Sequence, residues 1–125
     1  MHIKCRRSAI NEMLMCPGAI VISGRRIELV NCLPKNKDLW SPEIAKVIAE
    51  INGIRFTDDM QRVIELVRDF WQKYHVCPPM SILELLTKMS GSSILKMFKN
   101  NYDIMCVLAG IEPPSGCLSR VLSTA

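Results

Sequence analysis

The strongest constraint on the fold is an apolar stripe of helical spacing between Thr57 and Tyr74. Its members recur every three or four positions, which is the period of one face of an α-helix: Met60, Val63, Ile64, Val67, Phe70, Trp71 and Tyr74. The charged positions between them are expected to face solvent: Arg62, Glu65, Arg68 and Asp69. Because acidic residues in the first turn suit the positive end of a helix dipole, Asp58 and Asp59 support a central helix over about residues 58–75.

Shorter helices are predicted on both sides of this central helix. Ser41-Pro42-Glu43 combines a capping residue, a proline and an acid, which is typical of a helix start, and Asn52-Gly53 supplies a stop, so a helix is expected near 42–52. Pro78-Pro79 must break the central helix, and further helices are expected near 79–90, 93–98 and 102–109. The helix near 79–90 carries five candidates for burial: Ile82, Leu83, Leu85, Leu86 and Met89.

A β-hairpin is expected before the helices, within about residues 19–30. Two apolar, partly alternating runs, 20–22 and 27–30, flank Ser23-Gly24, which is a turn signal. Residues 31–39 are expected to be a connection. The region up to Gly18 has no clear period and is expected to be a loose extension, residues 1–18.

Length and composition predict one soluble domain. A chain of 125 residues is near the commonest single-domain size, and 49% hydrophobic residues are too many for a disordered protein. No uncharged apolar run is long enough for a membrane span. The domain is expected over residues 19–110. Residues 111–125, with Pro113, Pro114 and Gly116, are expected to form a mobile arm that carries Cys117.

Six cysteines are spread along the chain: Cys5, Cys16, Cys32, Cys77, Cys106 and Cys117. They lack the dense spacing of a small secreted protein, and no signal-peptide cleavage site follows the N-terminus, so we expect reduced thiols in a cytoplasmic protein. No CxxC, HExxH, GxGxxG or Walker loop occurs. Because His75-x-Cys77 offers only two possible zinc ligands, neither a metal nor another cofactor is predicted.

Cys106 and Cys117 have a setting that the other cysteines lack. Cys106 falls on the last predicted helix and Cys117 on the arm, with glycines and prolines between them. Along a helix or an extended chain their Cα atoms would be about 16 or about 36 Å apart, whereas a disulfide needs about 7 Å or less. The two thiols can therefore meet only where the arm bends back. A buried Cys106 with an incidental tail cysteine remains an alternative.

Several stretches together resemble the DsrC/TusE family of small sulfur-carrier proteins, which includes the gamma subunit of dissimilatory sulfite reductase. The stretches that carry the resemblance are Trp40-Ser41, Ile44–Glu50, Gly53-Ile54, Val67–Phe70, Pro79 and Cys106-x-x-Ala109-Gly110-Ile111-x-Pro113-Pro114-x-Gly116-Cys117. The resemblance covers about residues 19–117, and the last motif is its most specific part. The family's arm cysteine is normally penultimate, whereas Leu118–Ala125 follow Cys117 here.

The resemblance implies an α+β, mainly α fold, with an N-terminal β-hairpin packed on a bundle of about five helices and a flexible C-terminal arm. It implies a sulfur carrier that acts as a protein co-substrate in dissimilatory sulfur metabolism, in sulfite reduction or sulfur oxidation. Cys117 matches the cysteine that carries sulfur as a persulfide, and Cys106 matches the cysteine that resolves it through an internal disulfide. On mild oxidation we therefore expect a Cys106–Cys117 bond. Expected partners are a sulfite reductase-like enzyme, the sulfurtransferases of a relay and a thiol–disulfide reductase.

Two other functions stay open. Family members that serve transfer-RNA thiolation resemble this chain too but generally need only the arm cysteine, so the presence of both cysteines favours the dissimilatory branch. The short helices near 93–98 and 102–109 also fit a helix-turn-helix module. Residues 102–109, however, offer few basic or amide side chains to read bases, and nucleic acid is not an expected partner.

Overall fold

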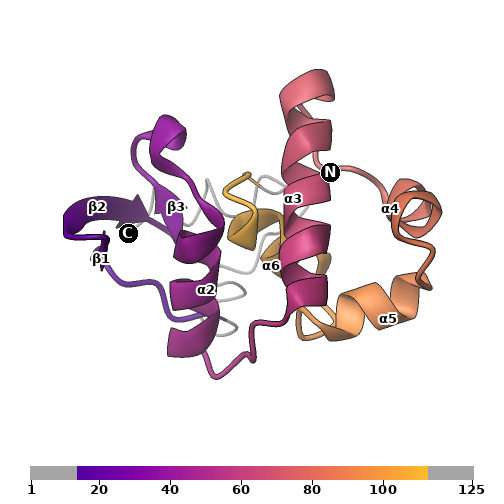
Figure 1. Ribbon diagram of the computed structural model, residues 1–125, viewed down its shortest axis with the longest axis horizontal. Helices are drawn as coiled ribbons and strands as arrows, with labels where there is room; N and C mark the ends of the chain where they lie inside the picture. The colour runs from indigo at the N-terminus through magenta and orange to yellow at the C-terminus, as the bar shows by residue number, and fades with distance from the viewer. Residues whose placement is uncertain (1–13, 113–125) are drawn as a thin grey trace, which may run out of the picture.

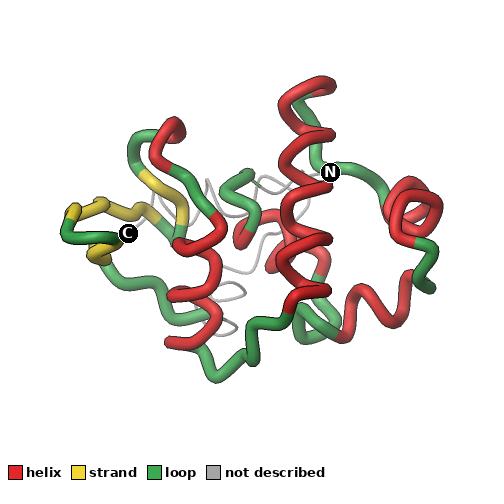
Figure 2. The backbone as a smooth tube through the Cα atoms, in the orientation of Figure 1, coloured by secondary structure: helices red, strands yellow, loops and turns green. Residues whose placement is uncertain are grey.

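The computed structural model describes residues 14–112, which form a three-stranded antiparallel sheet followed by five α-helices (Figure 1). The fold is α+β and mainly α, as the sequence predicts. The strands gather at one end of the molecule, and the two short helices that follow the central helix lie at the other end (Figure 2). Of the helices in residues 14–112, none combines the length and the apolar composition needed to cross a bilayer.

The sheet is built from two tight turns. Strands β1 (Ala19–Ile22) and β2 (Arg25–Val30) pair with Ile20 opposite Ile27, and the turn between them places Ser23 and Gly24 at positive φ. Two successive residues at positive φ match the right-handed twist of a hairpin. The predicted hairpin is confirmed. Beyond it, β2 turns again into a third strand, β3 (Leu33–Pro34), which lies inside the stretch that we expected to be a connection.

The first two long helices start and stop where the sequence predicts. After a short 3₁₀ turn, η1 (Lys37–Leu39), helix α2 spans Pro42–Ile51 and helix α3 spans Asp58–Tyr74. The Thr57 side chain accepts a hydrogen bond from Met60 N at 3.2 Å and so caps α3. His75 ends α3 in the left-handed conformation at φ 59°.

Two features of α3 differ from the prediction. Tyr74, the last member of the expected apolar stripe, is 61% exposed. Arg68, which we expected to face solvent, is only partly exposed and lies between two tryptophans. The periodicity therefore predicts the buried face of α3 correctly over its first three turns and misassigns the end of the helix.

Helix α4 (Met80–Thr87) is shorter than the helix expected near 79–90, and helix α5 (Gly91–Lys96) begins earlier than the helix expected near 93–98. Ser90 caps α5 by accepting from Ser93 N at 3.2 Å, so this helix starts two residues before the predicted Ser93. In α4 only Leu83 and Thr87 are buried, because a single face of this helix packs on the rest of the domain. Leu85 at 75% and Leu86 at 48% are exposed, so the prediction that both are buried is wrong.

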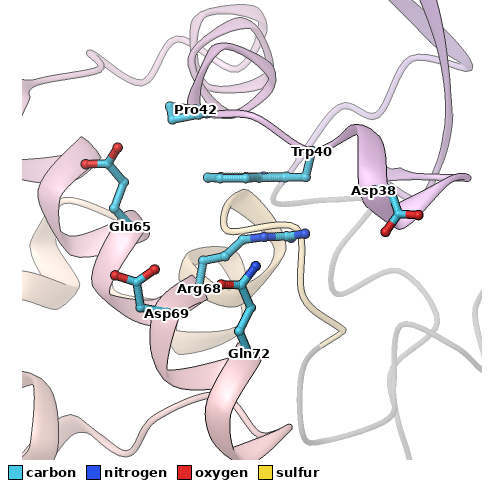
Figure 3. Close-up of a pocket in the computed structure, with 7 residues that line it drawn as sticks. All are labelled: Asp38, Trp40, Pro42, Glu65, Arg68, Asp69 and Gln72. Atoms are coloured by element: carbon cyan, nitrogen blue, oxygen red, sulfur yellow. The ribbon is translucent and has the colours of Figure 1, made fainter.

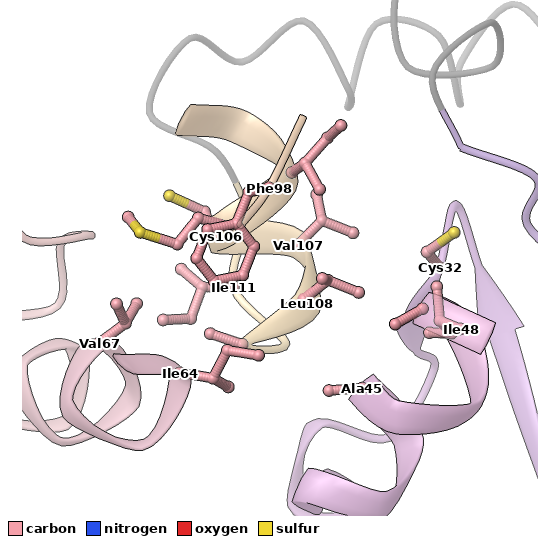
Figure 4. Close-up of a cluster of buried hydrophobic side chains, with 14 of the residues drawn as sticks. Cys32, Ala45, Ile48, Ile64, Val67, Phe98, Cys106, Val107, Leu108 and Ile111 are labelled. Atoms are coloured by element: carbon pink, nitrogen blue, oxygen red, sulfur yellow. The ribbon is translucent and has the colours of Figure 1, made fainter. Parts of the chain in front are cut away.

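Helix α6 (Tyr102–Leu108) forms the centre of the core, and its last five residues are at most 1% exposed. In Figure 4 it lies between Ile64 and Val67 of α3 on one side and Ile48 of α2 on the other. Phe98, which is fully buried, covers the side of α6 next to Cys106. The core thus encloses the helix that carries one of the two predicted site cysteines.

The last part of the expected N-terminal extension is packed on the domain. Leu14 is 1% exposed within the core cluster, and Gly18 O accepts a hydrogen bond from Leu29 N at 2.9 Å. Asn52 Nδ2 donates to Met15 O at 3.1 Å. The physical reason is that Leu14 stands in a short apolar run, Met13 to Cys16, which has neither a helix nor a strand period, so the pattern does not show that Leu14 is buried while Met15 is 66% exposed. Residues 14–18 are therefore not loose.

Candidate functional site

The candidate site is the C-terminal end of α6, where the chain leaves the core. Gly110 has φ 76° and follows the helix in the left-handed conformation. Ile111 N donates to Cys106 O at 2.9 Å, and Gly110 N donates to Val107 O at 2.9 Å. These are the two hydrogen bonds of a Schellman motif, which ends a helix and turns the backbone. The chain therefore turns one helical turn after Cys106.

A clamp of one arginine and two tryptophans holds this turn. The Arg68 guanidinium carbon lies 4.7 Å from the centre of the Trp40 ring and 5.3 Å from that of Trp71. Both distances are within the range of cation–π attraction. Figure 3 shows the Trp40 ring edge-on above the guanidinium group. We call Arg68, Trp40 and Trp71 the clamp.

The clamp donates hydrogen bonds to the end of α6. Arg68 Nη1 donates to Ala109 O at 3.1 Å and to Gly110 O at 3.4 Å, and Trp40 Nε1 donates to Leu108 O at 3.1 Å. The last carbonyls of a helix have no hydrogen-bond partner inside the helix, so the donors of the clamp supply partners for the carbonyls at the end of α6. Arg68 Nη2 also donates to Lys37 O at 3.1 Å, which ties η1 to the same point.

Burial affects the charge of the clamp. It lowers the pKa of Arg68 because the charged form loses water, while the nearby carboxylate of Asp38 opposes this shift. Arg68 nevertheless stays charged at neutral pH, since an arginine pKa begins far above that range. Its donors are directed at backbone carbonyls, so the arginine acts as a positioning residue for the turn.

Two hollows border the clamp. One, of about 510 Å³, is lined by Asp38, Trp40, Pro42, Glu65, Arg68, Asp69 and Gln72 (Figure 3). Three carboxylates face it, which makes it a poor site for an anion. The other, of about 300 Å³, is lined by Leu33, Lys37, Trp71, His75, Gly110, Ile111 and Glu112. The second hollow lies directly beside the chain as it leaves the core.

The structure places Cys106 in the core and bonds it to Cys77. Their Cα atoms are 6.3 Å apart, Cys106 is fully buried and Cys77 is 7% exposed. Because a sulfur atom forms one disulfide at a time, Cys106 is not paired with Cys117 in this state, which differs from the expected Cys106–Cys117 bond. No local signal in the sequence points to Cys77, since the two cysteines are 29 residues apart.

The remaining cysteines are only partly covered by the structure. Cys117, the other predicted site residue, and Cys5 lie outside the described residues. A second disulfide joins Cys16 to Cys32, whose Cα atoms are 4.9 Å apart. In the described part of the chain the cysteines are thus oxidised, which differs from the expectation of reduced thiols.

The structure also bears on two alternatives from the sequence. Among residues 14–112 no three side chains of His, Cys, Asp or Glu gather as a metal site would require. Helix α6 is buried along Ile104–Leu108, and a recognition helix must present a face to the DNA groove. The structure therefore contradicts the helix-turn-helix alternative.

Arg68 is the functional residue that the sequence pattern missed. Its position three residues before Trp71 on a helix, together with the second tryptophan of the chain at Trp40, is the signal that points to it in retrospect. A planar guanidinium stacks on aromatic faces, so an arginine next to tryptophans need not face solvent.

Comparisons with known proteins agree with these observations. The family model described as "DsrC like protein" matches residues 23–118. The dissimilatory-type sulfite reductase subunit gamma of Nitratidesulfovibrio vulgaris is 28% identical over 83 residues, which are 65% of this chain and 79% of that protein. The sulfurtransferase TusE of Buchnera aphidicola subsp. Baizongia pistaciae is 31% identical over 88 residues, 63% of this chain and 94% of that protein.

A solved structure shares the fold. The solution structure of the Pyrobaculum aerophilum DsrC/gamma subunit of dissimilatory sulfite reductase aligns with a TM-score of 0.66 and 27% identity, over 82% of this chain and 96% of that chain. The order of the sheet and the helices therefore belongs to a fold that this protein shares with a solved family structure.

Proposed function

Because the chain belongs to the DsrC/TusE family of sulfur carriers, we propose that it serves dissimilatory sulfur metabolism as a protein co-substrate, with Cys117 as the sulfur-carrying thiol and Cys106 as the resolving thiol. The single observation that carries this proposal is the clamped turn at Gly110. It fixes the start of the arm beside the helix that bears Cys106, so a thiol on the arm begins its path close to its proposed partner.

The proposed chemistry needs two thiols. Cys117 takes up a sulfane sulfur and becomes a persulfide. The Cys106 thiolate then attacks the Cys117 sulfur, a disulfide forms between the two cysteines, and the outer sulfur leaves as sulfide. Two thiols are oxidised and one sulfane sulfur is reduced, so the electrons balance.

The partners and location follow from this chemistry. A sulfite reductase-like enzyme or the sulfurtransferases of a relay would supply or accept the sulfur, and a thiol–disulfide reductase would restore the two thiols. A cytoplasmic location is proposed because the cycle starts from reduced thiols, which that compartment maintains.

The test is to load the reduced full chain with a persulfide donor. Added mass on each cysteine is mapped by mass spectrometry, and released sulfide is measured. We expect sulfur on Cys117 in the wild type, no loading in Cys117→Ser, and loading without sulfide release in Cys106→Ser. Cys5→Ser, which removes a cysteine that precedes the residues matched by the family model, is the matched control and should behave as the wild type.

The same experiment separates the two branches of the family. If Cys117→Ser loads as fully as the wild type, the carrier role of Cys117 is refuted. If Cys106→Ser releases sulfide at the normal rate, the resolving role of Cys106 is refuted, and the relay to transfer RNA with a single cysteine becomes the better assignment.

A further inference from the structure

Cys77 lies where a cysteine can compete for Cys106. It follows the left-handed end of α3 at His75 and precedes Pro78-Pro79, on the loop that leads to α4. The Cα atoms of Cys77 and Cys106 are 6.3 Å apart, inside the usual range for a disulfide, and the structure joins the two sulfur atoms. The fold therefore places the two cysteines at a distance suited to a disulfide.

Besides the disulfide, hydrogen bonding by Tyr102 holds the Cys77 loop in place. The one proton of the Tyr102 hydroxyl is shared between Pro78 O at 2.7 Å and Cys77 O at 3.1 Å. Tyr102 is the first residue of α6 and stands four positions before Cys106, which places both on one face of that helix. Tyr102 thus anchors the loop of Cys77 to the helix that carries Cys106, and this anchor does not depend on the oxidation state of the cysteines.

The Cys77–Cys106 pair is buried in the domain. Cys106 is fully buried and Cys77 is 7% exposed, so a reagent in solution reaches the pair only through Cys77. In a reducing compartment, disulfides that do form are usually catalytic or redox-sensing. A buried, preorganised pair that includes the proposed resolving cysteine fits that description.

We propose that Cys77 is a third redox-active cysteine, which takes the disulfide from Cys106 and so frees Cys117 for another round. This inference rests on the proposed function. The step is a thiol–disulfide exchange: the Cys77 thiolate attacks the Cys106 sulfur of the Cys106–Cys117 bond, a Cys77–Cys106 bond forms, and Cys117 leaves as a thiolate. No net oxidation occurs in this step. A dithiol reductant then returns Cys77 and Cys106 to thiols and is itself oxidised to a disulfide.

The exchange has a functional consequence for the carrier. The arm thiol becomes available again while the chain still holds the oxidising equivalents in its core. A chain without Cys77 would instead keep its arm closed on Cys106 until an outside reductant opened it. Cys77 therefore separates the reloading of the arm from the reduction of the protein.

The test follows disulfides in the reduced full chain after one round of sulfide release. Persulfide is supplied in an amount equal to the protein, thiols are trapped by alkylation, and cross-linked peptides are mapped by mass spectrometry. In the wild type we expect a Cys77–Cys106 cross-link and alkylated Cys117. In Cys77→Ser we expect a Cys106–Cys117 cross-link and loss of alkylated Cys117. Cys32→Ser, which removes the other described disulfide, is the matched control and should match the wild type.

Two further measurements keep the result decisive. Tyr102→Phe leaves every cysteine in place but removes the anchor of the Cys77 loop, and the transfer from Cys117 to Cys77 should slow at least several-fold. Reduced Cys117→Ser treated with oxidised glutathione should still form the Cys77–Cys106 cross-link. If Cys77 stays alkylated in the wild type while Cys106–Cys117 accumulates, the inference is refuted. If Cys117 never takes up sulfur but the glutathione reaction gives the cross-link, the proposed function fails and the redox pair stands.

Discussion

Replacing Gly110 with alanine should destabilise the protein more than the same change at any other described glycine of positive φ. A Cβ atom at Gly110 would lie 2.6 Å from Arg68 Nη1 and 2.8 Å from Trp40 Cγ, closer than real Cβ atoms come to such neighbours. Gly53 has nearly the same backbone, φ 70° against 76°, but nothing lies within 4 Å of its Cβ position. Gly53→Ala is therefore a control with the backbone cost and without the clash.

The magnitude follows from the contacts that must yield. A non-glycine residue in the left-handed region costs about 1 kcal/mol, and this cost applies at both glycines. At Gly110 the new methyl group must also displace Trp40 or Arg68, each of which donates to a carbonyl at the end of α6. Losing one or two such bonds costs about 2 kcal/mol. We expect the free energy of unfolding to fall by about 3 kcal/mol for Gly110→Ala and by about 1 kcal/mol for Gly53→Ala.

The assay is urea unfolding followed by far-ultraviolet circular dichroism, with both variants and the wild type held in the same disulfide state. Equal slopes of free energy against urea would show that the three proteins expose the same surface on unfolding, so that the midpoints can be compared. If Gly110→Ala loses no more stability than Gly53→Ala, the clamp does not hold the turn at the end of α6 in place.

Three further changes test the surrounding structure. Arg68→Lys keeps the charge but removes the planar fork that reaches two segments, so urea unfolding should show a loss of about 2 kcal/mol; an unchanged stability would contradict the role of the fork. Burial, and secondarily Asp103, raise the pKa of Tyr102, so its stabilising hydrogen bonds are complete below about pH 10 and are lost as pH rises through the raised pKa. Tyr102→Phe should therefore have a lower free energy of unfolding than the wild type at neutral pH, and the difference should shrink in strong alkali. Urea unfolding of both proteins at a series of pH values measures this difference. A difference that stays constant with pH would contradict the stabilising role of the Tyr102 hydroxyl. Thr57→Ala should cost about 1 kcal/mol in thermal or urea unfolding because it removes a helix cap, whereas Ser41→Ala should cost much less, since the Ser41 side chain makes no capping bond; equal losses would argue against the cap.

The long helices could be predicted from sequence because their signals are local. Helix α3 has a capping threonine, acidic residues in its first turn and an apolar stripe, and all of these lie within one stretch of chain. Strand β3 could not be predicted in the same way, because two residues, one of them Pro34, are too few to show a period. Leu85 and Leu86 were wrongly predicted to be buried. Helix α4 has apolar residues on more than one face, and the domain covers only one of these faces.

The candidate site was harder to predict because it is assembled across the chain. Trp40, Arg68 and Gly110 come from three separate segments, and only folding brings them together. The family resemblance draws attention to the end of α6 through its glycine. It does not reveal that the glycine is needed to leave room for a stacked arginine, nor that Cys106 has a nearby partner in Cys77.

On the proposed function, the clamped turn also limits how deep an active site Cys117 can enter. Ile111 is 2% exposed, so the reach of Cys117 is counted from about Glu112, and five Cα–Cα steps, with four residues between the two ends, separate Glu112 from Cys117. Even a fully stretched chain of that length spans only about 17 Å. If Cys117 carries sulfur, as proposed, a partner must bring its reacting sulfur within this radius of the turn. Inserting one residue after Glu112 would extend the radius by about 3.5 Å, so on the proposed function arm length would select among partners by the depth of their channels.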